Sequence, residues 1–160
     1  MPTATLSMIY CVHQATGTDT AVNEAIAQLP EMLLPEQLTG ISAIAAIRSL
    51  PGVIAAVDTA RADPDDLYIT TDTSGGRQNA VWPAQGSDVR MQAGQSATPD
   101  IALEFDHSQN VSLWDYDSAS DDDLLGSVTM FAHESGRGEI VKLAKSSVEN
   151  AYYYVAYQVD

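Results

Sequence analysis

Short apolar runs separated by Gly, Ser and Asp residues make up most of the chain outside residues 20–64. In residues 101–105, apolar and polar side chains alternate, which is typical of a half-buried strand. The closing run places Tyr153, Val155, Tyr157 and Val159 on one face and Tyr152 and Tyr154 on the other. Strands are predicted at residues 6–12, 67–71, 80–82, 101–105, 111–114, 127–131, 140–143 and 151–159. Together they predict a mainly β fold, an antiparallel eight-stranded β-sandwich.

Residues 20–64 have a helical pattern instead. An i, i+4, i+7 spacing of apolar residues predicts a first helix over 22–29, and a proline in the first turn opens a second over 35–50. A short third helix is expected within 53–62. Because this tract separates the first two strands, we expect a single domain over residues 1–160 with a small α-helical insertion at 20–64.

Charge narrows the classes of partner. The chain has 22 acidic and 7 basic side chains, a net charge of −15, and 45% apolar residues. Such a surface repels nucleic acid, so a nucleic-acid partner is excluded. The single cysteine, Cys11, excludes an internal disulfide framework. Neither a signal peptide nor a transmembrane segment is visible, so we expect a soluble protein, cytoplasmic or exported without a cleaved signal.

Nine of the fifteen aspartates are concentrated within residues 63–72 and 115–123. The second group directly follows an apolar strand, so it forms the loop that leaves a buried strand. Two carboxylates about 5 Å apart repel by about 3 kcal/mol at an effective dielectric of about 20. Such a group needs a bound cation or raised pKa values, and its hard oxygen donors suit Ca²⁺ first and Mg²⁺ second.

Two metal-site templates match this loop poorly. An EF-hand counted from Asp115 would need Gly where Ser120 stands and a bidentate Glu where Gly126 stands. The Asp-x-Asp signature of haloacid dehalogenase phosphatases matches Asp115 and Asp117 in part, but Ala119 replaces its Thr or Val. A Mg²⁺-dependent phosphohydrolase using Asp115 and Asp117 is therefore the alternative to a binding function.

A third template matches without a gap. Residues 113–126, Leu-Trp-Asp-Tyr-Asp-Ser-Ala-Ser-Asp-Asp-Asp-Leu-Leu-Gly, resemble the third calcium loop of C2 domains. The resemblance implies that Asp115, Asp117 and Asp123 are calcium ligands and that Tyr116 adds a backbone carbonyl. We expect Asp121 and Asp122 to be solvated residues that add to the negative electrostatic potential of the loop but do not bind the ion directly.

The first calcium loop of C2 domains supplies two more aspartates, the second just before a tyrosine. Asp66-Leu67-Tyr68 resembles that second element, with Leu67 in place of proline, and a slight change of register would substitute Asp65. Asp19 resembles the first element, although it also suits the N-cap of the first inserted helix. The resemblance covers residues 5–19 and 65–160 and implies that the sandwich folds without the insertion between them.

The resemblance implies a non-enzymatic, calcium-binding C2-like module. C2 domains commonly bind acidic phospholipid, but the loop tip here, Ser118-Ala119-Ser120, is neither apolar nor basic. A protein or glycan partner, contacted through the helical insertion, is therefore favoured over a phospholipid membrane. Cys11 and His13 share a strand face without a positioned acid or base, which argues against catalysis there.

Overall fold

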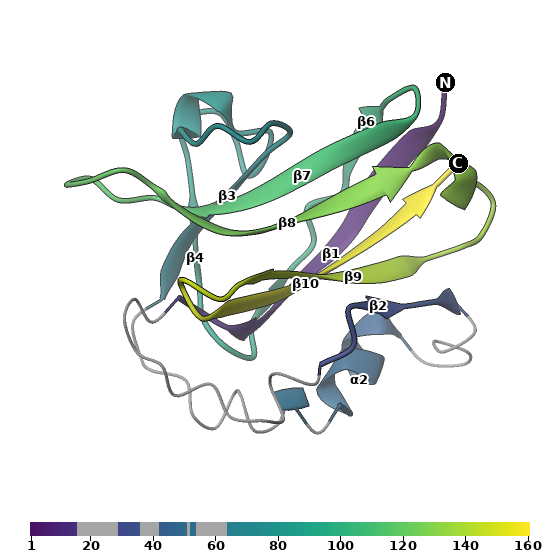
Figure 1. The fold of residues 1–160 in the computed structure, drawn as a ribbon, viewed down its shortest axis with the longest axis horizontal. Coiled ribbons are helices and arrows are strands. Elements are labelled where there is room, and N and C mark those ends of the chain that lie inside the picture. Colours follow the sequence, from purple (N-terminus) through teal and green to yellow (C-terminus); the bar gives the residue numbers. More distant parts are fainter. Residues whose placement is uncertain (16–28, 36–41, 51, 54–63) are drawn as a thin grey trace.

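The computed structural model of the protein describes residues 1–15, 29–35, 42–50, 52–53 and 64–160, and these form two antiparallel sheets packed face to face (Figure 1). The predicted β-sandwich is thus confirmed. The strands are β1 (Thr3–His13), β2 (Met32–Leu33), β3 (Asp65–Thr70), β4 (Val89–Met91), β5 (Ser96–Ala97), β6 (Ile101–Glu104), β7 (Ser108–Asp115), β8 (Asp123–Phe131), β9 (Ile140–Ser146) and β10 (Ala151–Val159). The helices are α2 (Ala43–Arg48) and two 3₁₀ turns, η2 (Arg77–Asn79) and η3 (Ala132–Glu134).

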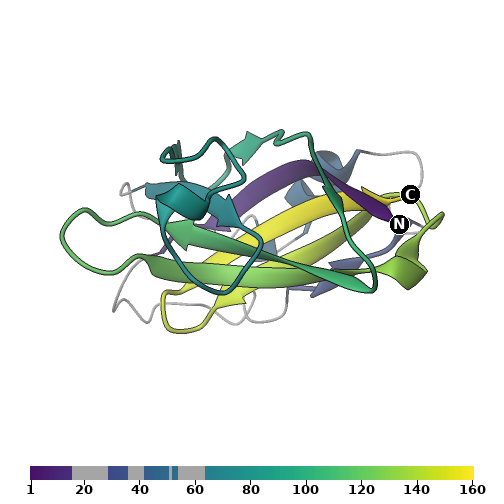
Figure 2. The ribbon, with the colours of Figure 1, turned by 90° about the horizontal axis from the view of Figure 1, so that it is seen from above.

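The larger sheet, called sheet A, has the order β2-β9-β10-β1-β5, with β6 also paired to β1. The smaller sheet, sheet B, has the order β4-β3-β7-β8. The two sheets enclose the main core, in which side chains of β1 and β10 meet those of β3, β7 and β8. In both views the loop between β7 and β8 projects from one end of the sandwich, and both termini lie at the opposite end (Figures 1 and 2).

Seven of the eight predicted strands are present in the described residues. The exception is residues 80–82, where a single bridge joins Trp82 to Ile69 and no strand forms. The sequence prediction missed β2, β4 and β5, each two or three residues long. Strands this short contain too few residues to show an alternating pattern.

The described part of residues 20–64 packs against sheet A. Figure 1 shows α2 on the side of sheet A that faces away from sheet B. A second apolar cluster fills this contact: Met8, Tyr10, Val12, Leu29, Leu33, Ala43, Ala46, Ile47, Val53, Val141, Tyr152, Tyr154 and Ala156. Both faces of β10 are therefore buried, one against sheet B and the other against the insertion. This packing argues against the expectation that the sandwich can fold without the insertion.

The predicted helices are described only in part. The first, over 22–29, and the third, over 53–62, lie almost wholly outside the described residues. The described part of the second is α2, which begins after Ser42; the Ser42 hydroxyl accepts the Ala45 N–H at 3.1 Å and caps the helix. None of the described helices has the length and apolar character needed to cross a bilayer.

Candidate metal-binding loops

The β7–β8 hairpin carries the loop at which the calcium ligands were predicted. Asp115 ends β7 and Asp123 begins β8, and the two are paired directly across the base of the hairpin. Asp115 is also paired with Leu67 of β3, on the other side. The strand register therefore places Asp66, Asp115 and Asp123 at the same end of sheet B.

The residue just after the base of this hairpin, Gly126, has to be a glycine for a steric reason. Its φ is +147°, and a Cβ there would lie 2.4 Å from the backbone nitrogen of Lys145 in β9. At this point β8 of one sheet comes so close to β9 of the other that no side chain can be accommodated. The glycine thus permits the close approach of the two sheets beside the loop.

Two hydrogen bonds, one to a side chain and one between backbone groups, join the β3 end to the loop. The Asp66 N–H donates to Asp115 Oδ1 at 2.7 Å, and the Tyr116 N–H donates to the Asp66 carbonyl at 2.9 Å. One carboxylate oxygen of Asp115 thus accepts a bond from β3. The predicted ligands Asp66, Asp115 and Tyr116 are held together, and no loop motion is needed to bring them near one another.

Charge repulsion is visible in the pKa values. The pKa of Asp115 is raised to about 6, chiefly by burial and to a smaller extent by the charges of Asp66, Asp123 and Asp117, while the bond from the Asp66 N–H acts in the opposite direction. Burial together with the charges of Asp117 and Asp122 also raises the pKa of Asp123. Four of the predicted ligands therefore act on one another electrostatically.

Asp117 has a different environment, because it is exposed at the start of the loop tip. Its Oδ1 accepts the Ala119 N–H and its Oδ2 accepts the Ser120 hydroxyl, both at 2.8 Å. These bonds lower its pKa, since they favour the ionised carboxylate. Asp117 thus shapes the tip of the loop through the same oxygens that a metal ion would use.

Asp122 is more firmly held than the sequence suggested. It accepts the Tyr68 hydroxyl at 2.5 Å and the Asp117 N–H at 2.9 Å, so it ties the loop to sheet B. Its expected role as a solvated residue is therefore corrected, whereas Asp121 is exposed as expected. The sequence contains no pattern that separates these two neighbours.

Asp65, which the sequence offered as a substitute for Asp66, is only 1% exposed. The Tyr153 hydroxyl donates to its Oδ2 at 2.5 Å, and the Ala15 N–H lies 3.1 Å from both carboxylate oxygens. Burial raises its pKa to about 7. Asp65 is buried in the core, whereas Asp66 is half-buried. Asp66 is therefore the more accessible of the two to a metal ion.

The donor chemistry of this end of the sandwich fits a hard divalent cation, because carboxylates and a carbonyl are the oxygens that Ca²⁺ uses. The side chains are not arranged as a finished cage, however. Within the described ranges, no three His, Cys, Asp or Glu side chains are grouped closely enough to hold a metal ion. Asp19, the remaining predicted ligand, lies outside the described residues.

Comparison with known proteins adds no assignment. No protein-family model matches the chain, and a search of the curated proteins finds no significant match.

Proposed function

We propose that this protein is a non-enzymatic, calcium-binding module of the C2 type, in which Ca²⁺ stabilises the end of the sandwich that carries the β7–β8 loop. The observation that supports it most directly is the raised pKa of Asp115, caused by burial and by three neighbouring carboxylates. A divalent cation bound among these groups would replace repulsion with attraction. Asp115, Asp117, Asp123, Asp66 and the Tyr116 carbonyl would supply oxygens, with Asp19 completing the set.

Binding would require a local exchange of hydrogen bonds. Asp117 would have to release the Ala119 N–H or the Ser120 hydroxyl to free an oxygen for the ion. Such an exchange offsets part of the binding free energy, because each released donor must find water instead. We therefore expect calcium to order the tip of the loop in a different hydrogen-bond pattern.

Calorimetry tests the calcium function. A ligand at a hundredfold excess over its Kd stabilises the native state by about 2.7 kcal/mol, which raises the Tm of a chain this size by several degrees. Scanning calorimetry in calcium should therefore give a higher Tm than in EGTA. Equal Tm values would contradict the proposal.

Paired variants in one loop test the ligand assignment. Asp117→Asn removes a predicted ligand charge but keeps an oxygen that can accept the Ala119 N–H, so the loop should keep its shape. Asp121→Asn removes the same charge from an exposed neighbour. Isothermal titration should show that calcium binding is lost in the first variant and largely retained in the second. Similar losses in both would mean that the ligand register is wrong.

The calcium-stabilised module would contact a protein or a glycan in preference to an acidic membrane, since the loop tip has no basic or large apolar side chain. Most apolar side chains of the described part of the insertion lie against sheet A, although Met32 is exposed. They are therefore not available to a partner in the way that the sequence suggested. Vesicles of acidic phospholipid that sediment the protein only with calcium would favour the membrane, and turnover of a phosphate ester with Mg²⁺ would favour the phosphohydrolase.

A further inference from the structure

β8 is the outer strand of sheet B, and within the described residues no other strand pairs with its free side. The backbone groups of successive residues in such a strand point alternately toward the neighbouring strand and away from it. The Ala132 N–H donates to the His107 carbonyl, on the β7 side. Ser127, Thr129 and Phe131 have the opposite parity, so their N–H and C=O groups point away from β7, along the free edge.

The free edge is open at these three residues. At Gly126 β8 still lies against β9, because a Cβ there would be 2.4 Å from the Lys145 nitrogen. Farther along the strand, a cavity of about 430 Å³ is lined by residues 127–129 and Phe131 of β8 and by residues of β9 and β2. The backbone groups that point away from β7 therefore border a space that part of another chain can enter.

The sequence of β8 favours pairing with a further strand. Residues 124–131, Leu-Leu-Gly-Ser-Val-Thr-Met-Phe, contain no charged side chain, although the whole chain has a net charge of −15. Two apolar side chains beside the edge are exposed, Phe131 at 38% and Met32 at 42%. An uncharged edge strand with apolar neighbours is a site at which a second chain can add a strand.

An ion pair already occupies two of the backbone groups on this edge. Lys142 Nζ donates to the Thr129 carbonyl at 2.5 Å. Glu134 Oε1 accepts the Phe131 N–H at 2.6 Å, and both Glu134 oxygens accept the Tyr157 hydroxyl. Lys142 Nζ lies 3.3 Å from Glu134 Oε2, and the two side chains are only 15% and 5% exposed. Side chains thus make two of the bonds that a neighbouring strand would otherwise make.

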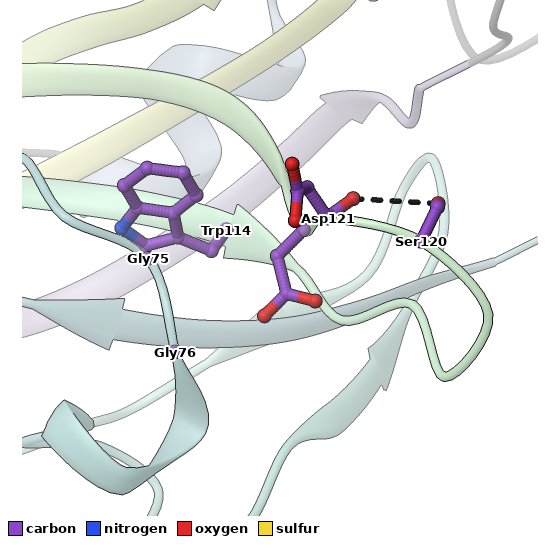
Figure 3. Close-up of a pocket in the computed structure, with 6 residues that line it drawn as sticks. Gly75, Gly76, Trp114, Ser120 and Asp121 are labelled. Atoms are coloured by element: carbon purple, nitrogen blue, oxygen red, sulfur yellow. Dashed lines mark hydrogen bonds between the residues drawn. The ribbon is translucent and has the colours of Figure 1, made fainter.

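The hollow beside the β7–β8 loop, at the other end of β8, is built differently. It lies between Trp114 and the loop residues Ser120 and Asp121 (Figure 3). The Trp114 Nε1–H donates to Thr70 Oγ1 at 2.9 Å, and a Cβ at Gly75 would lie 3.1 Å from the ring. The indole is therefore covered and its donor is bonded. The edge at residues 127–131, where backbone groups face a cavity, is better suited to contact with another chain.

We propose that the Lys142–Glu134 pair prevents self-association of this protein through β8, because it holds edge groups that the β8 strand of a second copy would bond. Two β8 strands can pair antiparallel about a twofold axis, which would join two copies of sheet B into one continuous sheet. A lysine at the edge of a sheet is one means by which proteins block such pairing. Net charge also keeps two copies apart, but salt screens that repulsion and affects a mostly buried pair much less. The proposal uses none of the predicted calcium ligands, so it does not rest on the calcium function.

Opening the edge should therefore produce a dimer. The double variant Lys142→Met/Glu134→Gln frees the Thr129 carbonyl without leaving a carboxylate buried alone. In EGTA and about 1 M NaCl, where the screening length is about 3 Å, sedimentation velocity should show a monomer for the natural chain and a dimer for the double variant. A double variant that is folded by circular dichroism and stays monomeric would overturn the proposal.

Amide hydrogen exchange tests the same edge in the natural chain, without any substitution. The Phe131 N–H, bonded to Glu134, should exchange slowly, whereas the N–H groups of Ser127 and Thr129 should exchange fast. In the dimer of the double variant the last two should become slow as well. Equal exchange of all three amides in the natural chain would overturn the proposal.

Two further variants separate edge pairing from a loss of stability. Lys145→Met/Glu31→Gln removes a second lysine–glutamate pair beside the same cavity, 3.4 Å apart and exposed, and should stay monomeric. Thr129→Pro, added to the Lys142→Met/Glu134→Gln variant, removes an N–H that points away from β7 and should restore the monomer, since an edge strand tolerates proline but cannot pair through it. Association that persists with the proline, or that is equal in the control pair, would overturn the proposal, because exposed apolar surface rather than the β8 edge would then cause it.

Discussion

The buried carboxyl of Asp65 should make the stability of the fold depend on pH. Burial raises its pKa from an ordinary 3.8 to about 7, although the Tyr153 hydroxyl and the Ala15 N–H act in the opposite direction. Between these two values the folded chain holds one more proton than the unfolded chain. The free energy of unfolding therefore falls as the pH rises through this window, and the stabilisation is fully lost above the folded-state pKa.

The size of the effect follows from the two pKa values. Ionising a carboxyl whose pKa rises from 3.8 to about 7 on folding costs about 4 kcal/mol over the whole window. Between about pH 5 and about pH 8, Asp65 should lower the free energy of unfolding by about 2–3 kcal/mol of this total. Asp115, whose pKa is raised to about 6, contributes in the same direction, but it is only half-buried and its share is correspondingly smaller.

Urea unfolding at about pH 5 and about pH 8, in EGTA, measures this difference. The Asp65→Asn variant has no carboxyl to titrate, so its difference between the two pH values should be about 2–3 kcal/mol smaller than that of the natural chain. Asp106→Asn, at an exposed position, should behave like the natural chain. An undiminished pH dependence in Asp65→Asn would refute the assignment of the buried proton to Asp65.

Three further changes test the packing around the site. Gly126→Ala should destabilise the fold by about 1–3 kcal/mol in urea unfolding, because its Cβ meets the Lys145 backbone; an unchanged midpoint would mean that the sheets can separate there. Tyr68→Phe removes the hydroxyl that bonds Asp122 and accepts the Gly76 N–H, and should cost about 1–2 kcal/mol; no loss would mean that the loop is anchored elsewhere. Replacing residues 20–64 with a Gly/Ser linker exposes apolar and tyrosine side chains of sheet A. Each of these side chains contributes about 1.5–3 kcal/mol when it is buried. Gel filtration of this variant should therefore show aggregated or unfolded protein. A monomer with a β-type circular dichroism spectrum would contradict this.

The longer strands could be predicted because each contains enough apolar residues to show a recognisable pattern. β10, with apolar side chains along both faces, was predicted with its observed bounds, and the predicted strands at 6–12, 111–114 and 127–131 lie inside the longer β1, β7 and β8. Residues 80–82 have the composition of a strand but follow the η2 turn directly, and they bond to β3 through Ile69 alone, by the Val81 N–H and the Trp82 carbonyl. The contact between the insertion and sheet A could not be predicted, because periodicity identifies an apolar face without naming what covers it.

The choice between Asp65 and Asp66 was within reach of the sequence. Neighbouring residues in a strand point to opposite faces, and Leu67 and Ile69 are both in the main core. Asp65 has the same parity as these two residues, so it must point inward, whereas Asp66 must point outward. The resemblance of Asp66-Leu67-Tyr68 to a C2 loop agrees with this alternation. What the sequence could not supply was the partner of the inward carboxyl, since Tyr153 comes from the far end of the chain.

The loop aspartates differ in their roles because each meets a different set of donors. Asp122 bonds to Tyr68 and to the Asp117 N–H, and so anchors the loop. Asp117 folds the tip through two short local bonds, and Asp115 accepts a bond from β3. These N–H and O–H groups partly neutralise carboxylates that would otherwise repel one another. A calcium ion at this end would have to replace the donors at Asp117 while leaving Asp122 in place. It would therefore bind to an anchored loop whose tip rearranges, and the order of the tip would depend on the ion.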